Sequence, residues 1–153
     1  MLGEVNGLTA GDLDKDEIIT LAAGRTYRIP APAVLLKAKL YNLASLVALD
    51  RPQDLRQARM LMLIVPHYFN ELYAEQCAGK ITLENLVGAI CYCRAIVHSG
   101  VAGNVSRAHR LDFRQLLPRS FGFASAEIQA AARQFMEGLP DIPAAEPPDS
   151  LAE

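Results

Sequence analysis

Two adjoining stretches decide the fold: IPAPAVLLKAKLYNL at residues 29–43 and DRPQDL at residues 50–55. Each contains a proline where a helix can begin, because proline lacks an N–H group and the first helical turn leaves that donor unpaired. We therefore predict one helix from Pro32 and a second helix from Pro52. Asp54 falls in the first turn of the second helix, where a carboxylate interacts favourably with the positive end of the helix dipole.

Apolar residues repeat at helical spacing after Pro32 and predict that one face of this helix is buried. Lys37 points away from that face, at roughly 200° around the helix. Lys39 lies at the edge of the face, where a lysine usually lays its aliphatic stem over the core and keeps its ammonium group in water. A ligand-facing ammonium group is the alternative for Lys39. The apolar stripe consists of Leu36, Leu40, Leu43 and Val47.

The polar residues of these two stretches resemble part of the AbiEii-like and related minimal nucleotidyltransferases. In that family a late strand leads through a proline-containing turn into a helix with Lys-Leu, and the next helix opens with Arg and Asp-Leu-x-Asp-Leu. Lys39-Leu40, Arg51 and Asp54-Leu55 match this pattern over roughly residues 18–65, whereas Gln57 stands in place of the second aspartate. The resemblance implies that Lys39 and Arg51 bind nucleotide phosphates and that Asp54 is a catalytic acid or base near the acceptor.

The catalytic centre of that family, a Gly-Ser turn followed by Asp-x-Asp that holds the metal ions, is not matched. The acidic pair of that form is Asp12-x-Asp14, extended by Asp16, but Gly11 precedes it and the sequence contains no Gly-Ser dipeptide. We therefore expect no catalysis and no cofactor for the chain alone. Mg²⁺ and a nucleoside triphosphate are expected only if a catalytic domain completes the site.

Two classes of function follow from these observations. In the first, the chain is a non-catalytic helical module that resembles the C-terminal half of a nucleotidyltransferase and acts with, or derives from, a catalytic domain. In the second, it is a stand-alone helical protein-interaction module with no nucleotide role. In that case Asp54 only stabilises a helix start and Lys39 only covers the core.

Composition narrows the setting of the protein. Its 153 residues are enough for one domain with a real core, and the net charge of −2 gives no general attraction to nucleic acid or to anionic membranes. Three cysteines, an odd number, argue against a disulfide framework and favour the cytoplasm. The longest apolar run, residues 60–66, is far shorter than a membrane span, so no membrane contact is expected.

The order of elements predicts a mainly α protein. Residues 1–17 are acidic and glycine-containing, which favours a flexible lead-in. Short strands are expected at residues 18–22 and 25–29, as a β-hairpin that precedes about five helices in an irregular bundle. Residues 18–138 then form the single domain. Residues 139–153 are rich in proline and acidic residues, which favours a disordered tail.

Helix boundaries follow from caps and breakers. The second helix should kink or restart at Pro66 and end before Gly79, and the third should begin after a Thr82 cap. We expect a loop at residues 100–106, then a short helix at residues 112–117 and a last helix capped by Ser125. The three cysteines have no metal-ligand spacing and are predicted to be small core residues: Cys77, Cys91 and Cys93.

Two features of the sequence suit contact with other molecules. Arginines outnumber acidic residues between Arg94 and Arg119, which suits phosphate or nucleic-acid binding, a solvated surface, or pairing with the acidic termini. The β-hairpin is marginal alone and leaves open edges that other strands can join. We therefore expect it to pair with its own copy in a homodimer or to join the sheet of a catalytic nucleotidyltransferase domain.

Overall fold

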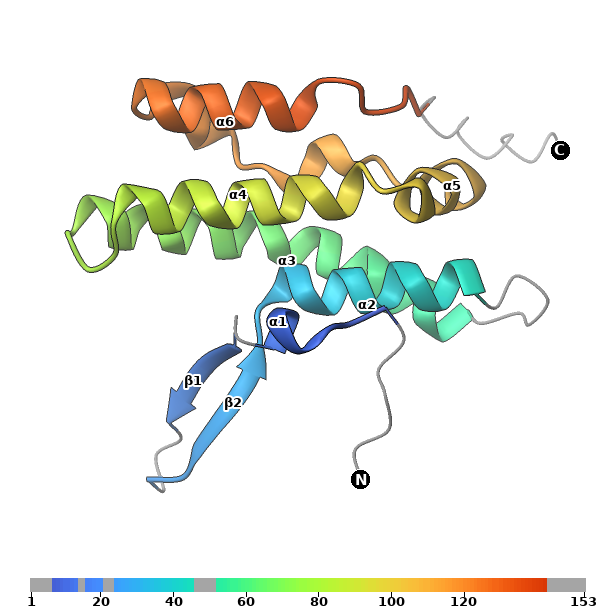
Figure 1. The fold of residues 1–153 in the computed structure, drawn as a ribbon, viewed down its shortest axis with the longest axis horizontal. Helices are drawn as coiled ribbons and strands as arrows, with labels where there is room; N and C mark the ends of the chain where they lie inside the picture. The colour runs from blue at the N-terminus through green and yellow to red at the C-terminus, as the bar shows by residue number, and fades with distance from the viewer. Residues whose placement is uncertain (1–6, 14–15, 21–23, 46–51, 143–153) are drawn as a thin grey trace, which may run out of the picture.

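The computed structural model describes residues 7–13, 16–20, 24–45 and 52–142, and it confirms a mainly α protein built as a helical bundle (Figure 1). Two strands and two short 3-10 helices, η1 and η2, accompany the α-helices. In chain order the elements are α1 (Ala10–Leu13), β1 (Asp16–Thr20), β2 (Thr26–Pro30), α2 (Pro32–Ser45), α3 (Pro52–Cys77), α4 (Leu83–Val97), α5 (Gly100–His109), η1 (Phe113–Leu116), η2 (Arg119–Phe123) and α6 (Ala126–Met136).

The helices enclose one continuous apolar core. Helix α2 packs against α3 and α5, while α4 packs against α3, α5 and α6. The short helices fill the remaining sides, because η1 lies on α3 and η2 lies on α6. The largest fully buried side chains come from α2, α3, α4, η1, η2 and α6, and they include Leu36, Leu40, Val65, Phe69, Leu86, Ile90, Phe113, Leu116, Phe121, Ile128 and Phe135.

The strands β1 and β2 pair antiparallel, with Asp16 opposite Pro30 and Thr20 opposite Thr26. We call this pair the β1–β2 ribbon. It extends away from the helices, and the chain passes from β2 directly into α2 (Figure 1). The strand positions differ from the sequence prediction, because β1 begins two residues earlier than expected. The predicted turn lies partly outside the described residues, which omit residues 21–23.

The predicted helix starts at Pro32, Pro52 and Thr82 are confirmed. Thr82 forms a capping box: its side chain accepts the Asn85 N–H, and the Asn85 side chain accepts the Thr82 N–H at 3.0 Å. Helix α3 ends before Gly79 as predicted. The φ of Gly79 is +71° and its N–H donates to the Gln76 carbonyl oxygen, as at a glycine helix terminus.

Two helix predictions are wrong. The restart at Pro66 does not occur, since α3 continues through this proline to Cys77; the packing of α3 against its neighbours outweighs the one hydrogen bond that proline removes. Residues 100–106 are not a loop but most of α5, which Ser99 caps by accepting the Ala102 N–H at 3.2 Å. Burial of Ala102 and Val105 holds this glycine-containing segment helical.

The ends of the predicted domain also need correction. Residues 10–13 form α1 and Asp16 already belongs to β1, so the flexible lead-in does not extend to residue 17. At the other end Leu139, which the prediction placed in the tail, is a core residue with 9% of its surface exposed. Residues 143–153 of that tail lie outside the described residues.

The cysteines differ from one another. Cys93 is fully buried in the core as predicted, and burial raises the pKa of its thiol to about 12. Cys77 and Cys91 are exposed, so their assignment to the core is wrong. Residues two apart on a helix point to nearly opposite sides, which is why Cys91 faces solvent when Cys93 faces the core.

Candidate functional site

The structure brings together two of the three residues singled out by the sequence. The Lys39 Nζ donates to Asp54 Oδ1 at 3.0 Å, so the middle of α2 is tied to the first turn of α3. The side chains of Lys39 and Asp54 are 28% and 11% exposed, respectively. The pair is therefore partly shielded from water but still reachable from one side. The third residue, Arg51, and the last residue of the apolar stripe, Val47, lie outside the described residues.

A second charged cluster, which the sequence analysis missed, lies where α1, α2 and α4 meet. The Asp12 carboxylate is buried, at 4% exposure, and accepts hydrogen bonds from three residues. The Lys37 Nζ donates to both of its oxygens at 3.0 and 2.8 Å, and the Tyr92 hydroxyl donates at 2.6 Å. The Thr9 N–H and hydroxyl donate at 2.6 and 2.8 Å. We call this arrangement the Asp12 cluster.

Part of the Asp12 cluster has a sequence signal. Thr9-Ala10-Gly11-Asp12 has the spacing of a capping box, in which an acidic residue three positions after the cap accepts the cap's own N–H. Its distant partners have no such signal. Lys37 points away from the apolar stripe of α2 as predicted, but α1 lies over it and supplies the carboxylate.

The electrostatics of the cluster favour the ionised carboxylate. Burial by itself would raise the pKa of Asp12, but the hydrogen bonds from Lys37, Tyr92 and Thr9 outweigh burial and hold the pKa well below its ordinary value. Burial raises the pKa of the Tyr92 hydroxyl, and its hydrogen bond to the Asp12 carboxylate raises it further. Asp12 is thus a fully partnered structural anion and not a free acid.

Gly7 fixes the N-terminal segment against α2. A Cβ at this position would lie 2.2 Å from Cγ of Tyr41, and the φ of Gly7 is +79°, a conformation that side chains rarely adopt. We expect Gly7→Ala to detach this segment and weaken the Asp12 cluster. Amide hydrogen exchange of residues 8–13 should become faster, while Gly11→Ala, with no atom closer than 4.0 Å to the new Cβ, should leave it unchanged. Equal exchange in both variants would contradict this contact.

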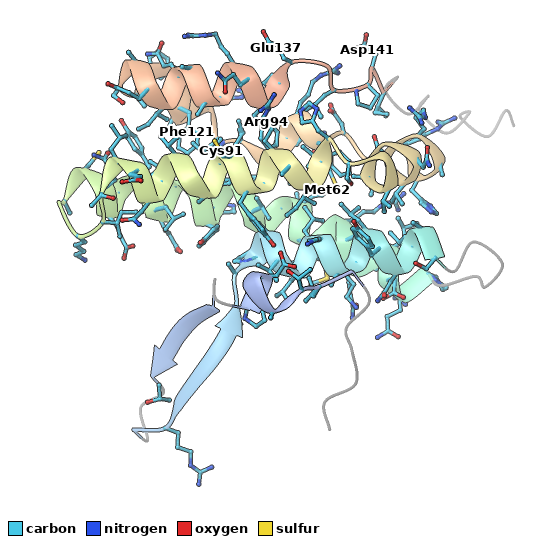
Figure 2. All side chains as sticks on the ribbon, viewed as in Figure 1. Met62, Cys91, Arg94, Phe121, Glu137 and Asp141 are labelled. Carbon is cyan, nitrogen blue, oxygen red and sulfur yellow. The ribbon has the colours of Figure 1, made fainter. Side chains whose placement is uncertain are left out.

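The arginines of the basic segment are used in different ways. Arg94 extends from α4 to α6, where its Nε donates to the Gln134 carbonyl oxygen at 2.9 Å (Figure 2). Arg107 donates to Asn104 on its own helix. Arg114 donates to the Pro140 carbonyl oxygen at 3.2 Å and forms an ion pair with Asp141. Pairing with the C-terminal acidic segment, one of the predicted alternatives, is thus confirmed for Arg114.

An open cleft of about 1140 Å³ lies between α6 and the segment that contains η1 and η2, with Pro66 of α3 also at its wall. We call it the arginine-lined cleft. Its cationic residues are Arg114, Arg119 and Arg133, and Glu137 is the acidic residue among them. Its apolar lining comes mainly from Leu117, Pro118, Phe121 and Met136.

Large apolar side chains are also exposed away from the cleft. Met60, Leu63 and Ile64 form a short stripe on the outer face of α3, with exposures of 59%, 68% and 44%. Phe123, at the end of η2, is 90% exposed, and Ile29 of the β1–β2 ribbon is 40% exposed. Contiguous apolar surface of this kind favours contact with other molecules.

Metal and membrane features are limited. Among the described side chains, no three histidine, cysteine or acidic residues are grouped so that they could hold a metal ion. Within the same residues no single helix has the length and hydropathy to cross a membrane. Helices α4 and α5, which are bent by 68° at their junction, meet the length and composition required of a membrane span only when they are taken together.

Comparisons with known proteins do not assign a function to this chain, so its function is inferred from the fold and the charged clusters. No family model matches the sequence, and neither the curated proteins nor the solved structures contain a significant match.

Proposed function

We propose that this protein is a helical interaction module that binds another chain by adding a strand to its β1–β2 ribbon. The observation that carries the proposal is the ribbon itself. The described residues contribute two strands and no third one, so each strand has one side that no described strand covers. Such uncovered edges present backbone N–H and C=O groups that another strand can pair with.

The connection to the helices gives the ribbon a fixed base. Ala31, between β2 and α2, is 5% exposed, and its carbonyl oxygen accepts the Val34 N–H at 2.8 Å in the first turn of α2. Val34 is fully buried. The base of the ribbon is therefore held by the buried first turn of α2. This attachment supports a fixed orientation of the ribbon toward a partner (Figure 1).

We expect the ribbon to pair with its own copy when no other partner is present. Sedimentation equilibrium should show a concentration-dependent dimer, in which amide exchange is slow across residues 16–20 and 26–30. Ile29→Lys should shift the protein to monomer, because a lysine on an exposed strand opposes edge pairing. The matched control is Leu63→Lys, which places the same charge on an exposed site of α3 and should leave the dimer intact.

Two results would contradict this proposal. A wild-type monomer whose ribbon amides are all already slow to exchange would show that the chain satisfies its own edges. A dimer that Leu63→Lys dissociates and Ile29→Lys does not would place the interface on α3 instead.

A second candidate, the accessory half of a nucleotidyltransferase, is supported by the contact between Lys39 and Asp54. In this reading the ribbon joins the sheet of a catalytic domain, Lys39 binds phosphate and Asp54 acts near the acceptor. The 3.0 Å ion pair brings the two groups together, which supports a shared site. An ion pair that only stabilises the contact between α2 and α3 would have the same geometry, which is why we rank this function second.

For either function we expect no nucleotidyl transfer by the chain alone. The carboxylate of Asp12 already accepts hydrogen bonds from Thr9, Lys37 and Tyr92, so a metal ion would have to displace the lysine. Asp14 lies outside the described residues. Incubation with labelled nucleoside triphosphates, Mg²⁺ or Mn²⁺ and candidate acceptors should give no labelled product. Transfer that an Asp12→Ala/Asp14→Ala variant loses would overturn this expectation.

A further inference from the structure

The arginine-lined cleft has unused positive charge. Arg119 and Arg133 are exposed, and within the described ranges neither forms an ion pair or a side-chain hydrogen bond. Guanidinium groups bind carboxylates through two parallel, charge-assisted hydrogen bonds. The apolar lining includes Phe121 and Met136, and Met136 is 38% exposed. The cleft thus suits an acidic segment that also carries apolar side chains.

The chain already contacts a residue of this cleft just before the C-terminal segment begins. Arg114, one of its lining residues, donates to the Pro140 carbonyl oxygen and pairs with Asp141. Leu139, one residue earlier, is packed in the core. Figure 2 shows Glu137 and Asp141 at the C-terminal end of α6, where the chain leaves the bundle. The segment that follows Ile142 therefore starts at the rim of the cleft.

We propose that residues 143–153 fold back and bind in the arginine-lined cleft. This segment contains three acidic residues, Glu146, Asp149 and Glu153, and no basic residue. Leu151 supplies the apolar side chain for the lining around Phe121 and Met136. The sign of the charge and the mixture of acidic and apolar groups match the cleft.

The length of the segment is sufficient. Eleven residues follow Ile142, and when extended they span at most about 36–40 Å. The cleft-lining face of α6, from Gln129 to Glu137, is only about 12 Å long at the rise of an α-helix. After a reversal near Pro143, the segment reaches Arg133 and Arg119 without strain.

A spin label on the segment tests the proposal in the full chain. In a Cys77→Ser/Cys91→Ser background the two exposed cysteines are removed, while Cys93 stays buried and unreactive. A nitroxide attached to Ser150→Cys should then weaken the NMR amide signals of residues 119–123 and of the cleft-lining face of α6. Signals from α5 should keep their intensity.

Charge variants show whether the arginines are responsible. Arg119→Gln/Arg133→Gln should restore the weakened signals. Arg107→Gln removes an exposed arginine that donates to Asn104 of its own helix and does not line the cleft, and it should not restore them. Raising the salt concentration to ~1 M, where the Debye length is ~3 Å, should act like the double variant.

Two outcomes would overturn the proposal. Amide signals that stay at full intensity along η2 and α6 would show that the segment does not bind there. Mixing ¹⁴N spin-labelled chains with unlabelled ¹⁵N chains gives the second test: if the weakening appears fully in this mixture, the segment binds a neighbouring copy and not its own cleft.

Discussion

Asp12→Ala is expected to lower the free energy of unfolding by ~3–5 kcal/mol, the usual effect of removing one partner of a buried ion pair. In this variant the Lys37 ammonium group and the Tyr92 hydroxyl lose the acceptor that compensates their burial. The Lys37 side chain is only 17% exposed. It also releases the segment that carries α1. For a domain of this size the melting temperature should fall by roughly 10 °C.

Two variants isolate the cause of this loss. Glu84→Ala removes an exposed acidic residue from the first turn of α4 and should change stability by less than about 0.5 kcal/mol. Asp12→Ala/Lys37→Met removes both charges, and because a missing partner costs more than a missing pair, it should recover part of the lost stability. Denaturant unfolding of the four proteins measures both effects. A double variant less stable than Asp12→Ala alone would show that the charge pair is not the origin of the loss.

The Asp12 cluster should also make the free energy of unfolding depend on pH in the acidic range. The folded-state pKa of Asp12 lies below its ordinary value of 3.8, so below about pH 4 the unfolded chain binds a proton that the folded chain does not. Stability from the cluster is therefore present above that pH and is lost progressively as the pH falls toward the folded-state pKa. Asp12→Asn should show a flatter decline between pH 4 and pH 2.5 than the wild type. Parallel declines would contradict the lowered pKa.

Phe121→Ala is expected to cost ~3–5 kcal/mol, the range for deleting a buried aromatic ring. Phe121 is 1% exposed and packs edge-to-face on Phe69 and Tyr73, with both ring centroids 5.9 Å away. These contacts attach η2 to α3, and α6 packs on η2. The loss should therefore include faster amide exchange in both η2 and α6.

Phe123→Ala is the matched control for this substitution. It removes the same ring two residues further along, where the side chain is 90% exposed, so stability should change by less than about 0.5 kcal/mol. Thermal or denaturant unfolding compares the two variants directly. If both lose the same stability, Phe123 is covered by another surface in solution and η2 is not held mainly by Phe121.

Local signals in the sequence determined several helix boundaries of this protein. Pro32, Pro52 and Thr82 set helix starts and Gly79 set a helix end, because caps and breakers act through the backbone of a few neighbouring residues. The resemblance to the nucleotidyltransferases, carried by Lys39-Leu40 and Asp54-Leu55, also implied that Lys39 and Asp54 share one candidate site. Arg114 and its acidic tail partner were among the alternatives that charge pattern alone permits.

Only the tertiary structure decided which side chains meet across the bundle. Lys37 and Tyr92 are far from Asp12 in the sequence, and no periodicity predicts a contact between them, because the cluster depends on how α1 lies over α2 and α4. Helix α5 likewise depends on the burial of Ala102 and Val105, which overrides its glycines. The arginine-lined cleft exists because η1, η2 and α6 meet around it. Long-range packing free energy, which sequence spacing does not encode, selected these arrangements over the local preferences.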